Sequence, residues 1–125
     1  MTEANVLYVD DERTNLLLFK ALLEKKYTIV TAEDGFAGLE ILQQDNQLKI
    51  VISDMKMPRM NGIEFIRRAK EVAPEIEFYI LTGFEITEEI QKALDVGLIR
   101  RYFKKPFNIN NISLEIDQAL EGSGG

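Results

Sequence analysis

Five short runs of β-branched and other apolar residues alternate along this chain with five segments of helical periodicity. The runs cover residues 6–9, 28–31, 50–52, 78–81 and 102–104. Strands that alternate with helices are joined by right-handed crossovers, which build a parallel sheet with helices on both faces. The sequence therefore predicts an α/β fold with a doubly wound (βα)5 sheet, in which the short and less apolar fifth strand lies near an edge.

Several helix ends are marked by residues with strong cap preferences. Asp34 and Thr87 suit the N-caps of the second and fourth helices, and Gly97 is a plausible end for the fourth. The last helix opens at either Asn108 or Asn110, since both side chains can accept a bond from an unpaired N–H of the first turn. These residues predict where four helix ends lie.

Composition excludes several classes of function. The 125 residues fit one domain, expected at 1–121, with Gly-Ser-Gly-Gly at 122–125 as a flexible tail of linker or cloning origin. The 15 basic and 21 acidic residues give a net charge of −6, which disfavours nucleic acid or an anionic membrane as partner. No apolar run approaches the roughly 20 residues of a membrane span, so we expect a cytoplasmic location. The chain has no Cys and no His, which excludes thiol chemistry, His-ligated zinc and a phosphohistidine on the chain itself.

Polar side chains follow four of the five apolar runs. Asp10 and Asp11 end the first run, Asp54 the third, Thr82 the fourth and Lys105 the fifth. The carboxyl ends of parallel strands meet at one edge of the sheet, where ligands bind in folds of this class. We therefore expect three carboxylates, one hydroxyl and one ammonium to share a single rim.

Such a cluster needs positive charge, because neighbouring carboxylates repel one another. Lys105 can pair with one carboxylate, and a divalent cation can be held by the others. Ligands that are all oxygen atoms favour Mg²⁺, which binds to one or two carboxylates and keeps water for phosphate oxygens. With a cation bound, Asp54 can attack phosphorus and form an acyl phosphate. The cluster therefore predicts phosphoryl chemistry.

Four motifs occur in order at these strand ends: V-D-D-E at 9–12, S-D-M-K-M-P-R-M-N-G at 53–62, L-T-G at 81–83 and K-P-F at 105–107. Together they make the chain, over roughly residues 5–121, resemble the receiver domain of two-component response regulators of the chemotaxis-regulator type. The resemblance implies a flavodoxin-like fold with a five-stranded parallel sheet of order 2-1-3-4-5. It also implies a phosphoacceptor in a phosphorelay, not an enzyme that turns over an external substrate.

The resemblance assigns roles to the residues of the rim. Asp54 would take a phosphoryl group from the phosphohistidine of a sensor histidine kinase or a histidine phosphotransfer protein. Asp11, Asp54 and the backbone carbonyl of Lys56 would bind Mg²⁺, and Asp10 would act through water. Lys105 would contact the phosphoryl group.

The resemblance also implies a switch. Thr82, beside Gly83 in the phosphoryl-binding segment, would move its hydroxyl onto a phosphoryl oxygen, and Tyr102 would rotate inward with it. The face made by the fourth helix, fifth strand and fifth helix would then change its affinity for an unknown output domain or protein, or for a second copy of the chain. Pro106 would follow a cis peptide bond.

Some positions depart from the pattern or tune it. Residues 98–101 form a loop that is one residue longer than is usual in such domains, so Tyr102 is interpreted either as a switch residue or as an aromatic that only packs. Lys56 and Phe84 flank the path of a hydrolytic water. We predict that both side chains affect the lifetime of the acyl phosphate.

Plainer interpretations and rival functions exist. Asp10 and Asp11 could cap the first helix, and Asp54 could be a loop acid. The basic residues within 100–105 indicate a docking or solvated surface more than a nucleic-acid site, because the domain is acidic. Two rivals to the switch are an aspartyl-phosphate phosphatase and a scaffold that works without phosphorylation. Such phosphatases place a second acid two residues after the nucleophile, where this chain has Lys56.

Overall fold

The structure, a computed structural model, describes residues 5–45, 47–83 and 85–123. The elements are β1 (Asn5–Val9), α1 (Arg13–Leu23), β2 (Thr28–Ala32), α2 (Gly35–Gln44), β3 (Leu48–Asp54), α3 (Gly62–Val72), β4 (Glu77–Thr82), α4 (Glu88–Asp95), β5 (Arg101–Lys104) and α5 (Ile109–Ser123). All five strands are parallel, in the order β2-β1-β3-β4-β5. The predicted α/β fold, its sheet order and the edge position of β5 are confirmed.

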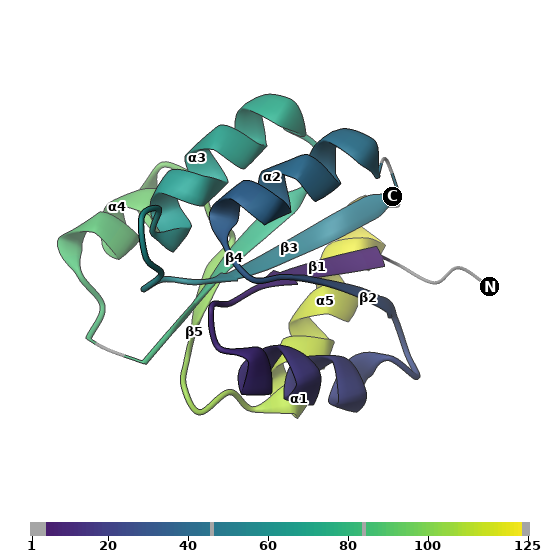
Figure 1. The fold of residues 1–125 in the computed structure, drawn as a ribbon. Helices are drawn as coiled ribbons and strands as arrows, with labels where there is room; N and C mark the ends of the chain where they lie inside the picture. Colours follow the sequence, from purple (N-terminus) through teal and green to yellow (C-terminus); the bar gives the residue numbers. More distant parts are fainter. Residues whose placement is uncertain (1–4, 46, 84, 124–125) are drawn as a thin grey trace.

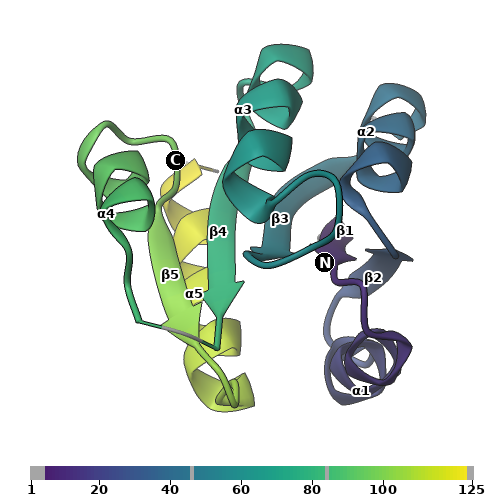
Figure 2. The same ribbon diagram turned by 60° about the vertical axis from the view of Figure 1, so that its left-hand side comes forward.

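Helices cover both faces of the sheet: α2, α3 and α4 lie on one face and α1 and α5 on the other (Figures 1 and 2). Alternate residues of a buried strand supply the two cores. On β1, Leu7 and Val9 belong to the core under α2–α4, whereas Val6 and Tyr8 belong to the core under α1 and α5. A strand that is covered on both faces has to be apolar throughout, which explains the continuous apolar runs.

The helices α2, α4 and α5 each begin at a residue whose side chain accepts hydrogen bonds from the first turn. The Asp34 carboxylate accepts a bond from the N–H of Ala37 at 2.8 Å, and the Thr87 hydroxyl accepts one from Ile90 at 3.2 Å, as predicted. For the last helix, the Asn108 side chain accepts bonds from two N–H groups of the first turn, at 3.0 and 3.2 Å. Of the two candidates, Asn108 is therefore the N-cap, since Asn110 supplies one of those N–H groups.

The end of α4 is a Schellman motif. Gly97 has φ of +78°, a left-handed conformation that glycine adopts without a steric cost. The N–H of Gly97 donates to the carbonyl of Leu94 at 3.1 Å, and the N–H of Leu98 donates to that of Ala93 at 2.8 Å. Gly97 therefore ends α4, as the sequence predicts.

The C-terminal end of α5 differs from its prediction, and residues 124–125 of the predicted tail lie outside the described residues. The helix includes Gly122 and Ser123, so the backbone of these two residues belongs to α5 and not to a flexible tail. The reason is that backbone hydrogen bonds can extend a formed helix by single residues of low propensity. Within the described residues, none of the helices is long and apolar enough to cross a membrane.

A buried carboxylate on α5 holds the edge strand in place. Glu115 is 6% exposed, and it accepts bonds from the Tyr79 hydroxyl at 3.2 Å and from Nε of Arg100 at 3.0 Å. Nε of Arg101 pairs with the same carboxylate at 2.6 Å, and Arg100 also reaches Glu77 at 3.2 Å. We call these five residues the Glu115 cluster. It joins β4, β5 and α5.

Candidate functional site

Asp54 is the last residue of β3, the middle strand of the sheet. Its backbone lies in register with Leu81 of β4, and the residue is only 5% exposed. Residues 50–52 of the strand are apolar and buried, and Asp54 is the carboxylate that β3 presents at the carboxyl edge of the sheet. The prediction that β3 delivers one acid to this rim is confirmed.

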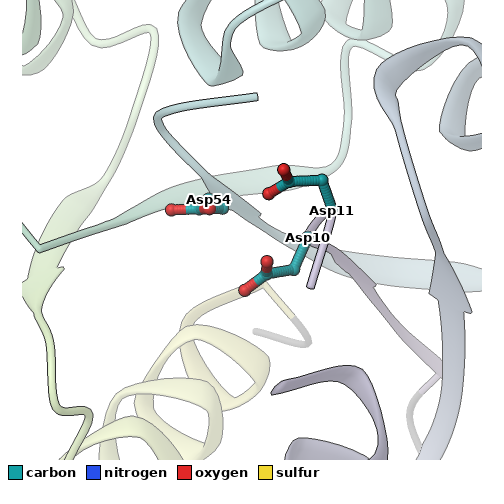
Figure 3. Close-up of side chains that lie close together, drawn as sticks. All are labelled: Asp10, Asp11 and Asp54. Carbon is teal, nitrogen blue, oxygen red and sulfur yellow. The ribbon is translucent and has the colours of Figure 1, made fainter. Parts of the chain in front are cut away.

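Two more carboxylates reach Asp54 from the end of β1 (Figure 3). One oxygen of each of Asp10, Asp11 and Asp54 lies within 4.8 Å of the other two. Asp10 is fully buried and Asp11 is exposed. We call these three residues the aspartate cluster. The structure brings together the acids that the sequence placed on one rim.

Lys105 supplies positive charge to this cluster. Its Nζ lies 3.2 Å from Oδ1 of Asp54 and 3.5 Å from Oδ2 of Asp10. Burial disfavours the ammonium, but the two carboxylates outweigh it and raise the pKa of Lys105. The backbone N–H of Lys105 donates to the carbonyl of Thr82 at 2.8 Å, which ties it to the end of β4. The following bond, Lys105–Pro106, is cis, as the resemblance implied.

The charges of the cluster do not balance. Burial raises the pKa of Asp54 to about 6, with a smaller contribution from repulsion by Asp10. Lys105 opposes this shift. At neutral pH the Asp54 carboxylate is therefore ionised at an energetic cost. Lys105 pairs with two of the three carboxylates, so the cluster can also hold a metal ion.

Asp10 is held by groups that the sequence analysis did not single out. Oδ2 of Asp10 accepts bonds from the Tyr8 hydroxyl at 2.6 Å and from Nδ2 of Asn15 at 3.2 Å. Oδ1 accepts the N–H of Glu12 at 2.9 Å. Residues two apart on a strand point to the same side, but a tyrosine in an apolar run does not by itself indicate a bond to Asp10.

The loop after Asp54 is closed by backbone contacts at both ends. The N–H of Met55 donates to Leu81 at 3.0 Å, and the N–H of Gly62 donates to the carbonyl of Met55 at 2.8 Å. A Cβ at Gly62 would lie 2.4 Å from the carbonyl oxygen of Asp54, so only glycine fits. Asn61, expected in a turn, is the N-cap of α3 and forms a capping box with Glu64.

An open pocket of about 580 Å³ lies over the aspartate cluster. Its lining residues are Asp11, Glu12, Asp54, Lys56, Met57, Pro58, Gly83 and Lys105. Lys56 is exposed at its mouth. The pocket gives a ligand access to the Asp54 carboxylate from solvent.

The remaining predicted site residues lie at the ends of β4 and β5. Thr82 is the last residue of β4 and is buried, and Gly83 is exposed in the pocket wall. A Cβ at Gly83 would make only ordinary contacts with the Lys105 side chain, at 3.6 and 3.8 Å. Phe84, which we predicted to affect the acyl phosphate, lies outside the described residues.

Tyr102 lies in the middle of β5, in register with Ile80. It is half-buried and packs against the core under α2–α4. In the preceding loop, Ile99 is buried and only 1% exposed. The N–H of Arg100 donates to the carbonyl of Phe78 at 2.8 Å. Both interpretations of Tyr102 are compatible with this position, because a half-buried ring can pack further inward.

The donor set fits a hard divalent cation. The acidic groups that lie together here are all aspartates, and the chain has no His or Cys that would favour a softer metal. Their oxygens are close enough for one ion and its bound water to contact all three. The excess of negative charge supplies the attraction.

The family model of the response regulator receiver domain matches residues 6–117. This chain belongs to that family. The match covers every strand of the sheet and the aspartate cluster, so the receiver domain accounts for both the fold and the site. The resemblance inferred from the four motifs is confirmed.

Relatives of the receiver domain agree with this assignment. Sporulation initiation phosphotransferase F of Bacillus subtilis is 31% identical over 113 residues, which are 90% of each chain. The hydrogenase transcriptional regulatory protein HoxA of Cupriavidus necator is 25% identical over 122 residues, and the present chain spans only 25% of its length. A receiver domain protein from Clostridium thermocellum, known as a crystal structure, has a TM-score of 0.90, 32% identity and 97% coverage of both chains.

Proposed function

We propose that this receiver domain accepts a phosphoryl group on Asp54 from the phosphohistidine of a partner, a sensor histidine kinase or a histidine phosphotransfer protein. One observation carries the proposal. The Asp54 carboxylate opens into the pocket within 3.2 Å of the Lys105 ammonium and within 4.8 Å of the Asp10 and Asp11 carboxylates. This is the arrangement that phosphoryl transfer to a carboxylate needs, namely a nucleophile with positive charge held beside it.

The transfer step requires little of the protein beyond position and charge. An oxygen of Asp54 attacks phosphorus and forms an O–P bond, while the P–N bond to the partner's imidazole breaks. The electron pair of that bond stays on the imidazole nitrogen. Because the pKa of Asp54 is about 6, the carboxylate is already ionised at neutral pH and no base has to remove a proton.

Mg²⁺ is the cation that we propose for the site. Asp11, Asp54 and the backbone carbonyl of Lys56 would hold it, with Asp10 acting through water. When bound, it would neutralise charge on the phosphoryl oxygens and on the carboxylates. Lys105 is placed to neutralise a further phosphoryl oxygen, because its ammonium already contacts the nucleophile.

Phosphorylation is proposed to act as a switch. The Thr82 hydroxyl, beside Gly83, would bond to a phosphoryl oxygen, and Tyr102 would move further inward from its half-buried position. The α4-β5-α5 surface would then change its affinity for an output domain or protein, or for a second copy of the chain. Converting a 1:99 mixture of two states into 99:1 takes roughly 5.5 kcal/mol. One charge-assisted hydrogen bond and one ion pair supply part of this energy.

The same proposal implies a functional class for the domain and a cellular location. The domain would be a phosphoacceptor and not a turnover enzyme, and the donor kinase, which uses ATP, implies the cytoplasm. A phosphatase of the aspartyl-phosphate type is disfavoured, because the position two residues after Asp54 holds exposed Lys56 and no acid. A scaffold that works without phosphorylation would have no use for Lys105 and three carboxylates in one pocket.

The test is the intact mass of the protein after incubation with Mg²⁺ and acetyl phosphate. The wild type should gain one phosphoryl group that hydroxylamine removes, and Asp54→Ala should gain none. If the folded wild type gains nothing with Mg²⁺ present, the scaffold reading replaces the switch. Thr82→Ala should still accept phosphate, and a variant that did not would contradict the division of roles between Thr82 and Lys105.

The side chain at position 56 provides a further test of the same site. Lys56 is exposed at the mouth of the pocket, where a hydrolytic water has to pass. Lys56→Ala should therefore change the rate at which the acyl phosphate is lost. An unchanged rate of dephosphorylation would refute this role.

A further inference from the structure

The hydroxyl of Tyr8 is an unexpected group in the core. Tyr8 is fully buried, and its ring fills a core position under α1 and α5 that a phenyl ring would fill as well. A buried hydroxyl is costly unless it is hydrogen-bonded. Here it lies 2.6 Å from Oδ2 of Asp10, so the hydroxyl serves the aspartate cluster and not the core.

The direction of this bond is fixed. Asp10 is fully buried, and its carboxylate accepts at both oxygens. Burial and the bond to Asp10 raise the pKa of Tyr8 well above its ordinary value, so the phenol keeps its proton and donates it. Asn15 at 3.2 Å and Lys105 at 3.5 Å are the longer contacts to the same oxygen.

The ring that carries the hydroxyl cannot shift easily. It stacks on Phe19 of α1, with ring centroids 4.1 Å apart and planes 16° apart. Phe19 in turn meets Phe107 edge-on at 5.8 Å, in the segment that follows Lys105 and Pro106. The hydroxyl is therefore held in position by packing before any cation arrives, which is the requirement for orienting a ligand group.

We propose that Tyr8 is a positioning residue of the cation site, which fixes the rotation of the Asp10 carboxylate through its hydroxyl. The proposal rests on the proposed function, since it concerns the affinity of the aspartate cluster for Mg²⁺. Loss of a partner that holds a metal ligand in place typically changes metal affinity by about 10- to 100-fold, and we expect the lower end of this range because Asp10 would reach the cation through water. Tyr8 acts through Asp10, and we assign it no contact with the phosphoryl group.

The experiment compares two substitutions that remove the same atom. Tyr8→Phe deletes the hydroxyl that faces Asp10. Tyr79→Phe deletes the hydroxyl of another fully buried tyrosine on the same face of the sheet, which bonds to Glu115 at 3.2 Å instead. Each protein is titrated with Mg²⁺ by calorimetry in the absence of any phosphoryl donor. Tyr8→Phe should bind Mg²⁺ about tenfold more weakly, whereas Tyr79→Phe should bind it as the wild type does.

A second readout separates positioning from general damage. With acetyl phosphate, the Mg²⁺ concentration for half-maximal phosphorylation should rise about tenfold in Tyr8→Phe, while the rate at saturating Mg²⁺ should stay close to that of the wild type. A structural role alone would not produce this split. Asn15→Ala, at a half-exposed helix position, should weaken Mg²⁺ binding by a smaller factor, because its bond to Asp10 is longer.

The outcomes distinguish the two proposals. If Tyr8→Phe binds Mg²⁺ like the wild type, or if Tyr79→Phe loses as much affinity as Tyr8→Phe, the positioning role is wrong while the proposed function stands. If the wild type itself neither binds Mg²⁺ nor gains a phosphoryl group, the proposed function fails.

Discussion

Among the residues that the structure describes, carboxylates are buried in two places, and their charges are compensated to different degrees. In the Glu115 cluster one acid accepts bonds from two arginines and a tyrosine. In the aspartate cluster one lysine pairs with two of the three acids. The first arrangement is electrostatically complete, and it ties an edge strand to a helix. In the second arrangement part of the negative charge has no positive partner, and a cationic ligand can supply one.

The same difference shows in how each acid is placed. Glu115 projects from the middle of α5, away from the carboxyl edge of the sheet, and its carboxylate bonds to Tyr79, Arg100 and Arg101. The aspartates stand at strand ends under an open pocket. A buried acid with a full set of partners stabilises the fold, whereas buried acids with unbalanced charge under an open pocket form a candidate binding site. Four measurements test this contrast.

The largest effect is expected from removing the partners of Glu115. In Arg100→Met/Arg101→Met the apolar stems remain but the carboxylate keeps only the Tyr79 hydroxyl, so the free energy of unfolding should fall by about 3 kcal/mol. Urea denaturation measures the change. Lys104→Met, at an exposed position on the same strand, is the matched control and should stay within about 0.5 kcal/mol. A loss no larger than the control's would mean that the cluster does not stabilise the fold.

Replacing an acid by its amide should have opposite effects in the two clusters. Without Mg²⁺ at about pH 7.5, Asp54→Asn should raise the free energy of unfolding by about 2 kcal/mol, because it removes a charge whose pKa is raised by burial and repulsion. Glu115→Gln should lower it by about 2 kcal/mol, because the arginines lose their charged acceptor. Chemical denaturation of both variants tests the signs. Shifts of the same sign would remove the contrast.

The pH dependence should follow Asp54. Its pKa is about 6 in the folded chain and 3.8 in a free side chain, so the folded state binds the proton more tightly and stability falls as pH rises through this range. The advantage of Asp54→Asn over the wild type should therefore shrink by roughly 1.4 kcal/mol between about pH 7.5 and about pH 5. Denaturation of both proteins at the two pH values measures this change. A constant difference would show that Asp54 titrates normally.

The smallest effect is the gain in stability from Mg²⁺ itself. A ligand at about three times its dissociation constant stabilises by about 0.8 kcal/mol. The wild type and the Arg100→Met/Arg101→Met variant should both show this gain in denaturation, while Asp54→Asn should lose most of it. If the arginine variant lost the gain instead, the two clusters would be coupled and not separate.

The sequence alone predicts the part of the candidate site that lies at the ends of the strands. Asp10, Asp11, Asp54 and Lys105 come together because parallel strands end at one edge, and this follows from the order of strands and helices. The caps at Asp34 and Thr87 follow from local chemistry in the same way. These features need no knowledge of how side chains pack.

Features that depend on packing could not be read in advance. A tyrosine inside an apolar strand looks like an ordinary core residue, so the bond from Tyr8 to Asp10 is visible only once the strand end is placed. Glu115 follows Ile112 by three residues and so lies within the buried stripe of its helix, but its arginine partners are set by the loop before β5. The choice between Asn108 and Asn110 differed by less than a helical turn, which is the usual uncertainty of a helix end.

The closed loop after Asp54 has a consequence for how such a domain can be varied. Backbone bonds at Met55 and Gly62 fix both ends of the loop, so the path of the main chain at Lys56 depends little on which side chain stands there. The carbonyl at position 56 and the side chain at position 56 are therefore separable design variables. Under the proposed function, a library of substitutions at exposed position 56 should change how long the phosphorylated state persists and leave the proposed cation site unchanged.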